Sequence, residues 1–187
     1  MRVITGTARG RKLKEPSGLD IRPTTDQVKE AIFNICQFDI EGRRVLDLFG
    51  GTGQLGIEAK SRGAAAVDIV DASPDSVRLI RENVKLTGLE VRVTRTDALS
   101  FLASCGHYDL IFLDPPYASG LAEQALERIK AFDILSNGGI ILCESDAKTT
   151  LPELGTPYRK QKEYRYGKVK LTLYTRDRSI APAGDGK

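Results

Sequence analysis

The sequence predicts an α/β fold in which helices cover both faces of a mostly parallel sheet. Between residues 45 and 143, short apolar segments alternate with segments whose apolar residues recur at helical spacing. Several apolar segments, such as residues 110–113, are continuous rather than alternating, which is typical of strands buried on both faces. A chain of 187 residues is also of a size that forms one domain with a substantial core.

The expected elements follow one another along this single domain, 1–187. Residues 1–22 hold a basic hairpin (2–14) and a loop, and residues 23–176 form the core. The first core helix is capped by Thr24 or Thr25. Strands and helices then alternate over 45–49, 54–62, 66–70, a helix from 74 through at least 86, and then 89–93, 98–103, 110–113, 121–132 and 140–143. An antiparallel hairpin, 158–166 and 169–175, completes a seven-stranded sheet, and 177–187 is expected to be a disordered tail.

Some details of these elements are specific enough to test. Ser73 is expected to cap the helix that begins at Pro74, and Ser119 to cap the helix 121–132. The buried side of the helix after Ser73 is expected to consist of apolar residues. These are Val77, Ile80, Val84 and Leu86.

Composition excludes several classes of protein. Three widely spaced cysteines and one histidine disfavour a disulfide framework, a zinc site and a histidine-based triad, so we expect no metal. No apolar run reaches the roughly 18–20 residues of a membrane span, and the first residues lack the apolar core of a signal peptide. We therefore expect a cytoplasmic protein with no membrane association.

The charge is unevenly distributed along the chain. Residues 1–22 hold six lysines and arginines against two acidic residues, and residues 158–178 hold eight against two, whereas the body between them is acidic. Basic segments at both ends suggest a polyanionic partner. The alternative is that these residues are solvated charges on edge strands, where lysine prevents aggregation.

A glycine loop follows the first strand of the predicted sheet. Gly51-x-Gly53-x-x-Gly56 opens a helix, and Asp71 ends the next strand 20 residues after Gly51. This spacing is typical of a loop that approaches a nucleoside-containing ligand, with the acid on the ribose hydroxyls. The alternative is that the glycines only pack a helix on a sheet. Asp47 precedes the loop, and its charge would oppose a pyrophosphate but suit an ammonium group.

A second motif, Asp114-Pro115-Pro116-Tyr117, ends the strand 110–113. Two prolines stop the strand and stiffen the loop at the edge where open α/β sheets bind ligands. Asp114 and the carbonyl of Pro115 can each accept an N–H of an exocyclic amine, and Tyr117 offers a flat face for a base. Such a pair of acceptors turns the nitrogen lone pair toward an electrophile, so that catalysis depends on positioning. The alternative is a rigid turn without chemistry.

These motifs together resemble those of the class I S-adenosylmethionine-dependent methyltransferases, which have a Rossmann-like fold. Residues 47–53, Asp-Leu-Phe-Gly-Gly-Thr-Gly, resemble motif I of that superfamily, and residues 114–117 resemble its amino-group methyltransferase signature. The resemblance implies S-adenosylmethionine as the cofactor. It also implies a set of cofactor-binding residues: Asp47, Phe49, Gly51, Gly53, Gly56, Asp71, Ala72, Asp97, Ala98 and Asp114. Asp97, implied to meet the adenine amine, is also placed to cap the following helix.

A longer pattern narrows the resemblance to the bacterial 16S ribosomal RNA guanine-N2 methyltransferases of the methyltransferase D type. It runs through residues 2–13, 22–34 and 55–64 and, with the other motifs, covers about residues 2–176. The resemblance implies methyl transfer to N2 of a flipped guanine, with Asp114, Pro115 and Tyr117 as catalytic residues. Basic residues of the two ends would bind the RNA, free or in an assembling subunit. They are Arg2, Arg9, Arg11, Lys12, Arg22, Arg159, Lys160, Lys162 and Arg165.

Three other functions stay open at this point. An adenine-N6 methyltransferase would use the same motifs, although the chain shows no separate target-recognition domain. A nicotinamide-dependent oxidoreductase would need a second catalytic group, and Tyr164 and Lys168 have the right spacing but fall in a predicted hairpin. A non-catalytic RNA-binding module would leave the motif at Asp114 without a role. No obligate protein partner is indicated.

Overall fold

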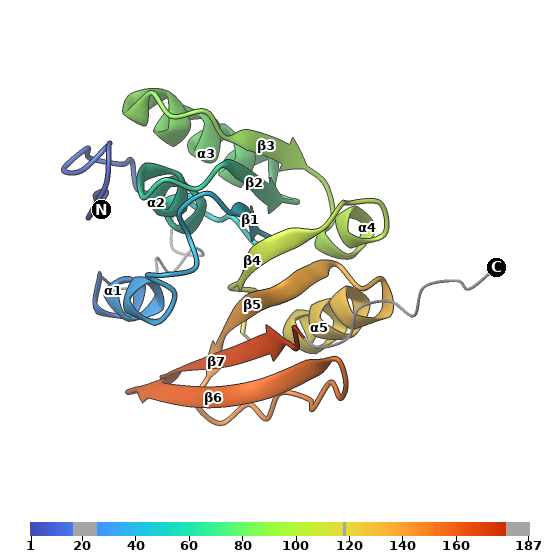
Figure 1. The fold of residues 1–187 in the computed structure, drawn as a ribbon. Helices are drawn as coiled ribbons and strands as arrows, with labels where there is room; N and C mark the ends of the chain where they lie inside the picture. Colours follow the sequence, from blue (N-terminus) through green and yellow to red (C-terminus); the bar gives the residue numbers. More distant parts are fainter. Residues whose placement is uncertain (17–25, 118, 179–187) are drawn as a thin grey trace.

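A computed structural model describes residues 1–16, 26–117 and 119–178. In this part of the chain, the strands form one seven-stranded sheet in the order β3-β2-β1-β4-β5-β7-β6 (Figure 1). The strands are β1 (Arg44–Asp47), β2 (Ala66–Asp71), β3 (Arg92–Arg95), β4 (Tyr108–Leu113), β5 (Leu135–Asp146), β6 (Tyr158–Tyr166) and β7 (Val169–Arg176). The helices are α1 (Asp26–Ile35), α2 (Gln54–Ser61), α3 (Pro74–Thr87), α4 (Ala98–Leu102) and α5 (Leu121–Ala131).

The first five strands of this sheet are parallel, and β7 and β6 add an antiparallel pair beyond β5. The predicted α/β class, with its seven strands and C-terminal hairpin, is confirmed. The order reverses at β1 and β4, which are neighbours although β2 and β3 lie between them in the sequence. Open α/β sheets bind their ligands at such a reversal, beyond the carboxyl ends of the strands.

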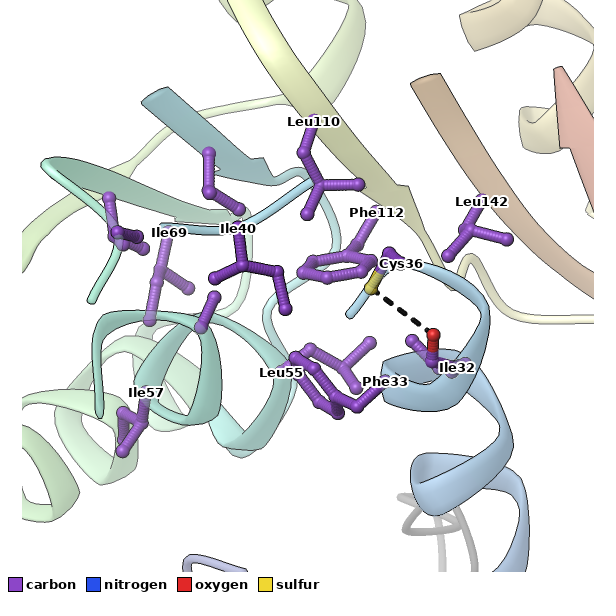
Figure 2. Close-up of a cluster of buried hydrophobic side chains, with 14 of the residues drawn as sticks. Ile32, Phe33, Cys36, Ile40, Leu55, Ile57, Ile69, Leu110, Phe112 and Leu142 are labelled. Atoms are coloured by element: carbon purple, nitrogen blue, oxygen red, sulfur yellow. Dashed lines mark hydrogen bonds between the residues drawn. The ribbon is translucent and has the colours of Figure 1, made fainter. Parts of the chain in front are cut away.

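Two hydrophobic clusters fill the two sides of the sheet. One joins the sheet to α1, α2 and α3, and the other joins it to α4 and α5, which lie on the opposite side in Figure 1. Figure 2 shows part of the first cluster, where the rings of Phe33 and Phe112 meet edge to face with centroids 5.6 Å apart. In the same view the buried Cys36 thiol donates a hydrogen bond to the carbonyl of Ile32. These contacts pack α1 on β4 beside the carboxyl end of the strand.

The N-terminal segment 1–16 folds back on itself and lies along α2 and α3 (Figure 1). The expected hairpin is present, but its pairing is a single antiparallel bridge between Arg2 and Lys12. Strands do not extend because much of the backbone bonds to α2 instead: the Glu58 carboxylate accepts the N–H groups of Ile4 and Thr5 at 2.7 and 2.9 Å. The segment is therefore anchored to the core by side chains of α2.

Several expected boundaries differ from the structure. β5 begins at Leu135 rather than at residue 140, and β3 begins at Arg92 rather than at residue 89. The residue that caps α5 is Gly120, in the left-handed conformation, whereas the hydroxyl of Ser119 accepts the Leu121 N–H from outside the helix.

The buried face of α3 also differs from the expectation. Leu86 was expected in the core and is 45% exposed, while Asn83 is fully buried in that face. The expected cap at Ser73 is confirmed, since its hydroxyl accepts the N–H of Ser76. The predictions for Arg22, Thr24, Thr25 and the tail from 179 onward lie outside the described residues. Among the residues described, no helix combines the length and apolarity needed to cross a membrane.

Candidate active site

The glycine loop connects β1 to α2 and is fixed by the end of β2. The Asp71 carboxylate accepts the N–H of Gly51 through Oδ2 and that of Ser73 through Oδ1, both at 2.8 Å. Gly51 and Gly53 have φ angles of 54° and 78°, a region that residues with a Cβ rarely adopt. The loop is thus held in a conformation that glycine permits, with Asp71 beneath it.

Two of the three motif glycines serve packing as well. A Cβ placed on Gly56 would lie 2.6 Å from the side chain of Ile69, and one on Gly53 would lie 3.1 Å from Ile80. Neither Gly53 nor Gly56 lines the cavity described below, whereas Gly51 does. A Cβ on Gly51 would meet no atom within 4 Å, so the space beside this residue is open.

Asp47 is a buried carboxyl group under the same loop. Its side chain is 1% exposed, and its Oδ2 accepts the backbone N–H of Gly56 at 2.9 Å. Burial raises the pKa of Asp47, the Gly56 hydrogen bond partly opposes this effect, and the nearby Asp71 charge adds to it, so that the pKa lies at about 7. Asp47 therefore joins β1 to α2 and also places a titratable group at the cavity.

The Asp-Pro-Pro-Tyr motif follows β4 directly. Pro115 is buried, whereas Tyr117 is 37% exposed. The Tyr117 hydroxyl donates a hydrogen bond of 2.8 Å to Oε1 of Glu144, a buried residue on the neighbouring strand β5. This bond ties the motif to β5 and leaves a large part of the tyrosine accessible.

One cavity of about 600 Å³ joins the glycine loop to this motif. Ten of the residues predicted for the cofactor and the chemistry line it: Asp47, Phe49, Gly51, Asp71, Ala72, Asp97, Ala98, Asp114, Pro115 and Tyr117. They come from the ends of four parallel strands and the loops that follow, which is where such sheets place ligands. The volume is that of a small-molecule site.

The residues of the cavity suit a cofactor with a nucleoside and a cationic group. Acidic side chains lie at or just after the ends of three consecutive strands, in Asp47, Asp71 and Asp97, and Gly50 and Gly51 also line the cavity. Carboxylates accept hydrogen bonds from hydroxyl and amino groups and attract cations. Asp97 also caps α4, since its Oδ1 accepts the N–H of Ser100 at 2.9 Å, so both interpretations of this residue are compatible with its position.

Sequence reasoning missed several residues that line the cavity. Val28 comes from α1, Glu144 from β5 and Val169 from β7, and the loop adds the polar residues Thr52 and Gln54. Glu144 had a signal in the sequence, because it is an acidic residue directly after the apolar residues 140–143. The sequence alone does not place Glu144 at the site, because its position there depends on β5 lying beside β4.

The basic residues expected to bind a polyanion do not all lie free on the surface. Among the described ones, Arg2, Arg9, Arg11, Lys12, Arg159, Lys162 and Arg165 are exposed. Lys160 differs, because its ammonium group bonds the carbonyl of Leu151 at 3.0 Å and Glu153 at 2.8 Å, and its side chain is 16% exposed. Lys160 thus holds the segment between β5 and β6 in place.

Comparison with known proteins identifies the family. Residues 1–175 match the family model described as conserved hypothetical protein 95. The chain is 35% identical over 179 residues to the ribosomal RNA small subunit methyltransferase D of Escherichia coli (strain K12), covering 95% of this chain and 90% of the relative. The chain belongs to this methyltransferase family.

Two further comparisons agree with this membership. YlbH of Bacillus subtilis (strain 168) is 37% identical over 180 residues, which are 93% of this chain and 98% of YlbH. The solved structure of the Escherichia coli protein yhhF superposes with a TM-score of 0.85 at 35% identity, covering 96% of this chain and 99% of that one. The predicted membership of the methyltransferase D family, with the Rossmann-like class I fold, is therefore confirmed.

Proposed function

We propose that this chain transfers the methyl group of S-adenosylmethionine to the exocyclic N2 amine of a guanine in small-subunit ribosomal RNA. The observation that carries the proposal is the single cavity that joins the glycine loop to Asp114, Pro115 and Tyr117. The family supports the donor, and the Escherichia coli relative, named for the small ribosomal subunit, supports the RNA.

The glycine-loop end of the cavity would hold the cofactor. Asp71 is the acceptor for the ribose hydroxyls and Asp97 for the adenine amine, while the ionised Asp47 attracts the ammonium group. Phe49, Gly51, Ala72 and Ala98 supply the walls. S-adenosylmethionine, when bound, supplies an electrophilic methyl group attached to a positively charged sulfur.

The other end of the cavity would hold the base. The carboxylate of Asp114 and the carbonyl of Pro115 each accept one N–H of the amine, so that the nitrogen lone pair faces the methyl carbon. The reaction is then a direct displacement in which positioning supplies much of the rate. The new nitrogen–carbon bond would replace the carbon–sulfur bond of the donor, whose sulfur would leave as a neutral thioether. Asp114, the carboxylate of the motif, would accept the proton that the nitrogen releases. The base must leave its stack to reach the Tyr117 ring.

The exposed basic residues at the two ends of the chain would bind the phosphates beside the cavity. Within the C-terminal hairpin, Lys162 is the better candidate than Lys160, because Lys160 is held by Leu151 and Glu153. Phosphate contacts of this kind fix the orientation of the RNA, and their strength falls steeply with salt.

Mapping of modified nucleosides tests this proposal. Small-subunit RNA from cells that lack the protein should lose one N2-methylguanosine and regain it with the wild-type gene. An unchanged guanosine pattern together with a lost N6-methyladenosine would instead favour the adenine-N6 alternative. Naked RNA and assembled subunits can then be compared as substrates with the purified protein.

A variant at Asp114 tests whether the cofactor and the base occupy different ends of the cavity. Asp114→Ala should lower methyl transfer by about 100-fold or more, because one of the two acceptors of the amine is lost. Calorimetry should show affinity for S-adenosylmethionine within a few-fold of the wild type. Tight binding of NAD with no binding of S-adenosylmethionine would contradict the proposal and favour an oxidoreductase.

A further inference from the structure

Glu144 is a buried carboxyl group beside the catalytic motif. Leu113, the last residue of β4, pairs with Cys143 of the adjacent parallel strand β5, so Asp114 and Glu144 are the next residues along these two segments. Side chains alternate along a strand, which puts both carboxyl groups on the sheet face that α1 covers. Glu144 is 6% exposed and lines the cavity together with Asp114 and Tyr117.

The carboxylate of Glu144 accepts a hydrogen bond from the Tyr117 hydroxyl at 2.8 Å through Oε1. An ionised carboxylate accepts about four hydrogen bonds on its two oxygens, so this bond uses a part of its capacity. The same group can accept an N–H from a base that lies against the tyrosine ring. Because it has no proton to donate when ionised, it discriminates between donors and acceptors on the edge of that base.

The bases that carry an exocyclic amine differ in the atom next to it. In guanine the ring nitrogen beside the N2 amine on the base-pairing edge is N1, which carries a hydrogen and donates, whereas N3 on the other side has a lone pair. In adenine and cytosine the ring nitrogen beside the amine has a lone pair and accepts. A carboxylate beside the amine is therefore complementary to guanine and repels the corresponding edge of the other two bases.

We propose that Glu144 determines the specificity of the base site by accepting the N1–H of guanine, while Asp114 and the carbonyl of Pro115 hold the N2 amine. This inference rests on the proposed function, because it requires a base amine at Asp114. Glu144 on β5 then selects the base, while Asp114 and Pro115 in the loop after β4 position its amine for methyl transfer.

A competing explanation is that Glu144 acts on the reaction only by holding Tyr117. Two variants separate the explanations. Glu144→Gln keeps the shape of the side chain and an oxygen for the tyrosine hydroxyl, but its amide can donate to a ring nitrogen. Tyr117→Phe keeps the ring and removes the hydrogen bond to Glu144. Asp146→Asn, two residues along the same strand and outside the cavity lining, is the matched control.

The experiment measures methyl transfer to two versions of the unmodified small-subunit RNA, joined by ligation from synthetic and transcribed pieces. One version carries guanine at the mapped target, and the other carries 2-aminopurine, which keeps the amine but has a lone pair on N1. The wild type should prefer guanine by about 100-fold or more in kcat/KM, as expected when a hydrogen-bonding site meets an analogue without the donor. Cofactor affinity, measured by calorimetry, confirms that each variant is folded.

Glu144→Gln should lower kcat/KM on the guanine RNA by about 10- to 100-fold, the range of a hydrogen bond to a charged group. It should also reduce the preference for guanine over 2-aminopurine to about 5-fold or less, because the amide can pair with either N1. Tyr117→Phe should leave this preference at the wild-type value whatever its effect on the rate, and Asp146→Asn should change neither quantity.

The inference is overturned if Glu144→Gln keeps the wild-type preference, or if Tyr117→Phe reduces it by the same factor. Equal use of guanine and 2-aminopurine by the wild type overturns it even if Glu144→Gln does not fold. The proposed function fails separately, and takes the inference with it, if the wild type methylates neither RNA or produces N6-methyladenosine.

Discussion

Asp47→Asn tests the electrostatic cost of the buried carboxyl group beneath the glycine loop. Asp47 is 1% exposed, and its pKa lies at about 7 instead of the ordinary 3.8 because burial disfavours its charged form. Between pH 3.8 and 7 the native protein keeps a proton that the unfolded chain has released, so the stability of the wild type falls as the pH rises through this window. Asparagine has no proton to release, and its oxygen can still accept the Gly56 N–H.

The size of the effect follows from the width of the window. From pH 5 to pH 8 the wild type loses roughly 2.6 kcal/mol of stability at this residue, because the slope of about 1.36 kcal/mol for each pH unit flattens near the native pKa. The free energy of unfolding of Asp47→Asn relative to the wild type should therefore increase by about 2–3 kcal/mol from pH 5 to pH 8. Any pH-independent effect of the amide on stability cancels in this comparison. The contribution of His107, the single histidine, cancels too, because it is present in both proteins.

Urea denaturation followed by circular dichroism at pH 5, 6, 7 and 8 measures this difference for both proteins. Equal m-values at each pH would show that the change reflects the native carboxyl group rather than a different unfolded state. A difference that is independent of pH, or that shrinks as the pH rises, would contradict a raised pKa of Asp47 in the native protein.

Three other predictions concern the cofactor, the N-terminal segment and the RNA. The affinity for S-adenosylmethionine, measured by calorimetry, should rise by up to about 10-fold from pH 6 to pH 8 in the wild type, because the ionised Asp47 attracts the ammonium group. It should stay constant in Asp47→Asn, and a rise in both proteins would contradict this role. Ser61→Ala removes a buried hydroxyl that donates to the Thr5 carbonyl at 2.6 Å, so it should lower the free energy of unfolding by about 1–3 kcal/mol. An unchanged urea midpoint would argue that this hydrogen bond does not anchor the N-terminal segment. Lys162→Glu should weaken RNA binding and reduce its salt slope by about 1 in filter-binding assays, whereas Lys160→Glu should mainly lower the melting temperature; the reverse pattern would contradict the assignment of the two lysines.

The alternation of strands and helices was predictable because parallel strands covered on both faces need continuous apolar segments. The bounds of β6 also agree with the structure, since its turn residues and alternation are local signals. The start of β5 was not predictable, because residues 136–139, Ser-Asn-Gly-Gly, have the composition of a loop. They belong to the strand because Leu135 pairs with Tyr108, and the register shift that follows is a property of two distant segments.

The buried face of α3 shows the same limit. Helical periodicity alone would place an apolar residue there, yet Asn83 occupies it. Its amide donates to the carbonyl of Thr52 at 3.0 Å, and its oxygen accepts the N–H of Lys14 at 2.7 Å. A buried polar side chain is stable where its hydrogen bonds are made, and both partners come from remote parts of the sequence.

In the site, the acidic residues after the strands were predictable because the carboxyl ends of parallel strands meet at one edge. Glu144 and Lys160 were not. The position of Glu144 depends on which strand lies beside β4, and the contacts of Lys160 depend on the path of the chain between β5 and β6. The sequence motifs therefore predicted the acidic residues of the site, whereas the contacts of Glu144 and Lys160 could be seen only in the tertiary structure.

Ile69 makes glycine a steric requirement at two places in the loop region. A Cβ on Gly50 would lie 2.4 Å from the Ile69 side chain, and one on Gly56 would lie 2.6 Å from it. In a combinatorial library, alanine at either position would therefore survive mainly in clones that also carry alanine at 69, because valine keeps the γ-carbons that lie too close. The tolerance of the glycine loop and of the start of α2 to substitution is therefore set by the side chain of residue 69 on the adjacent strand β2.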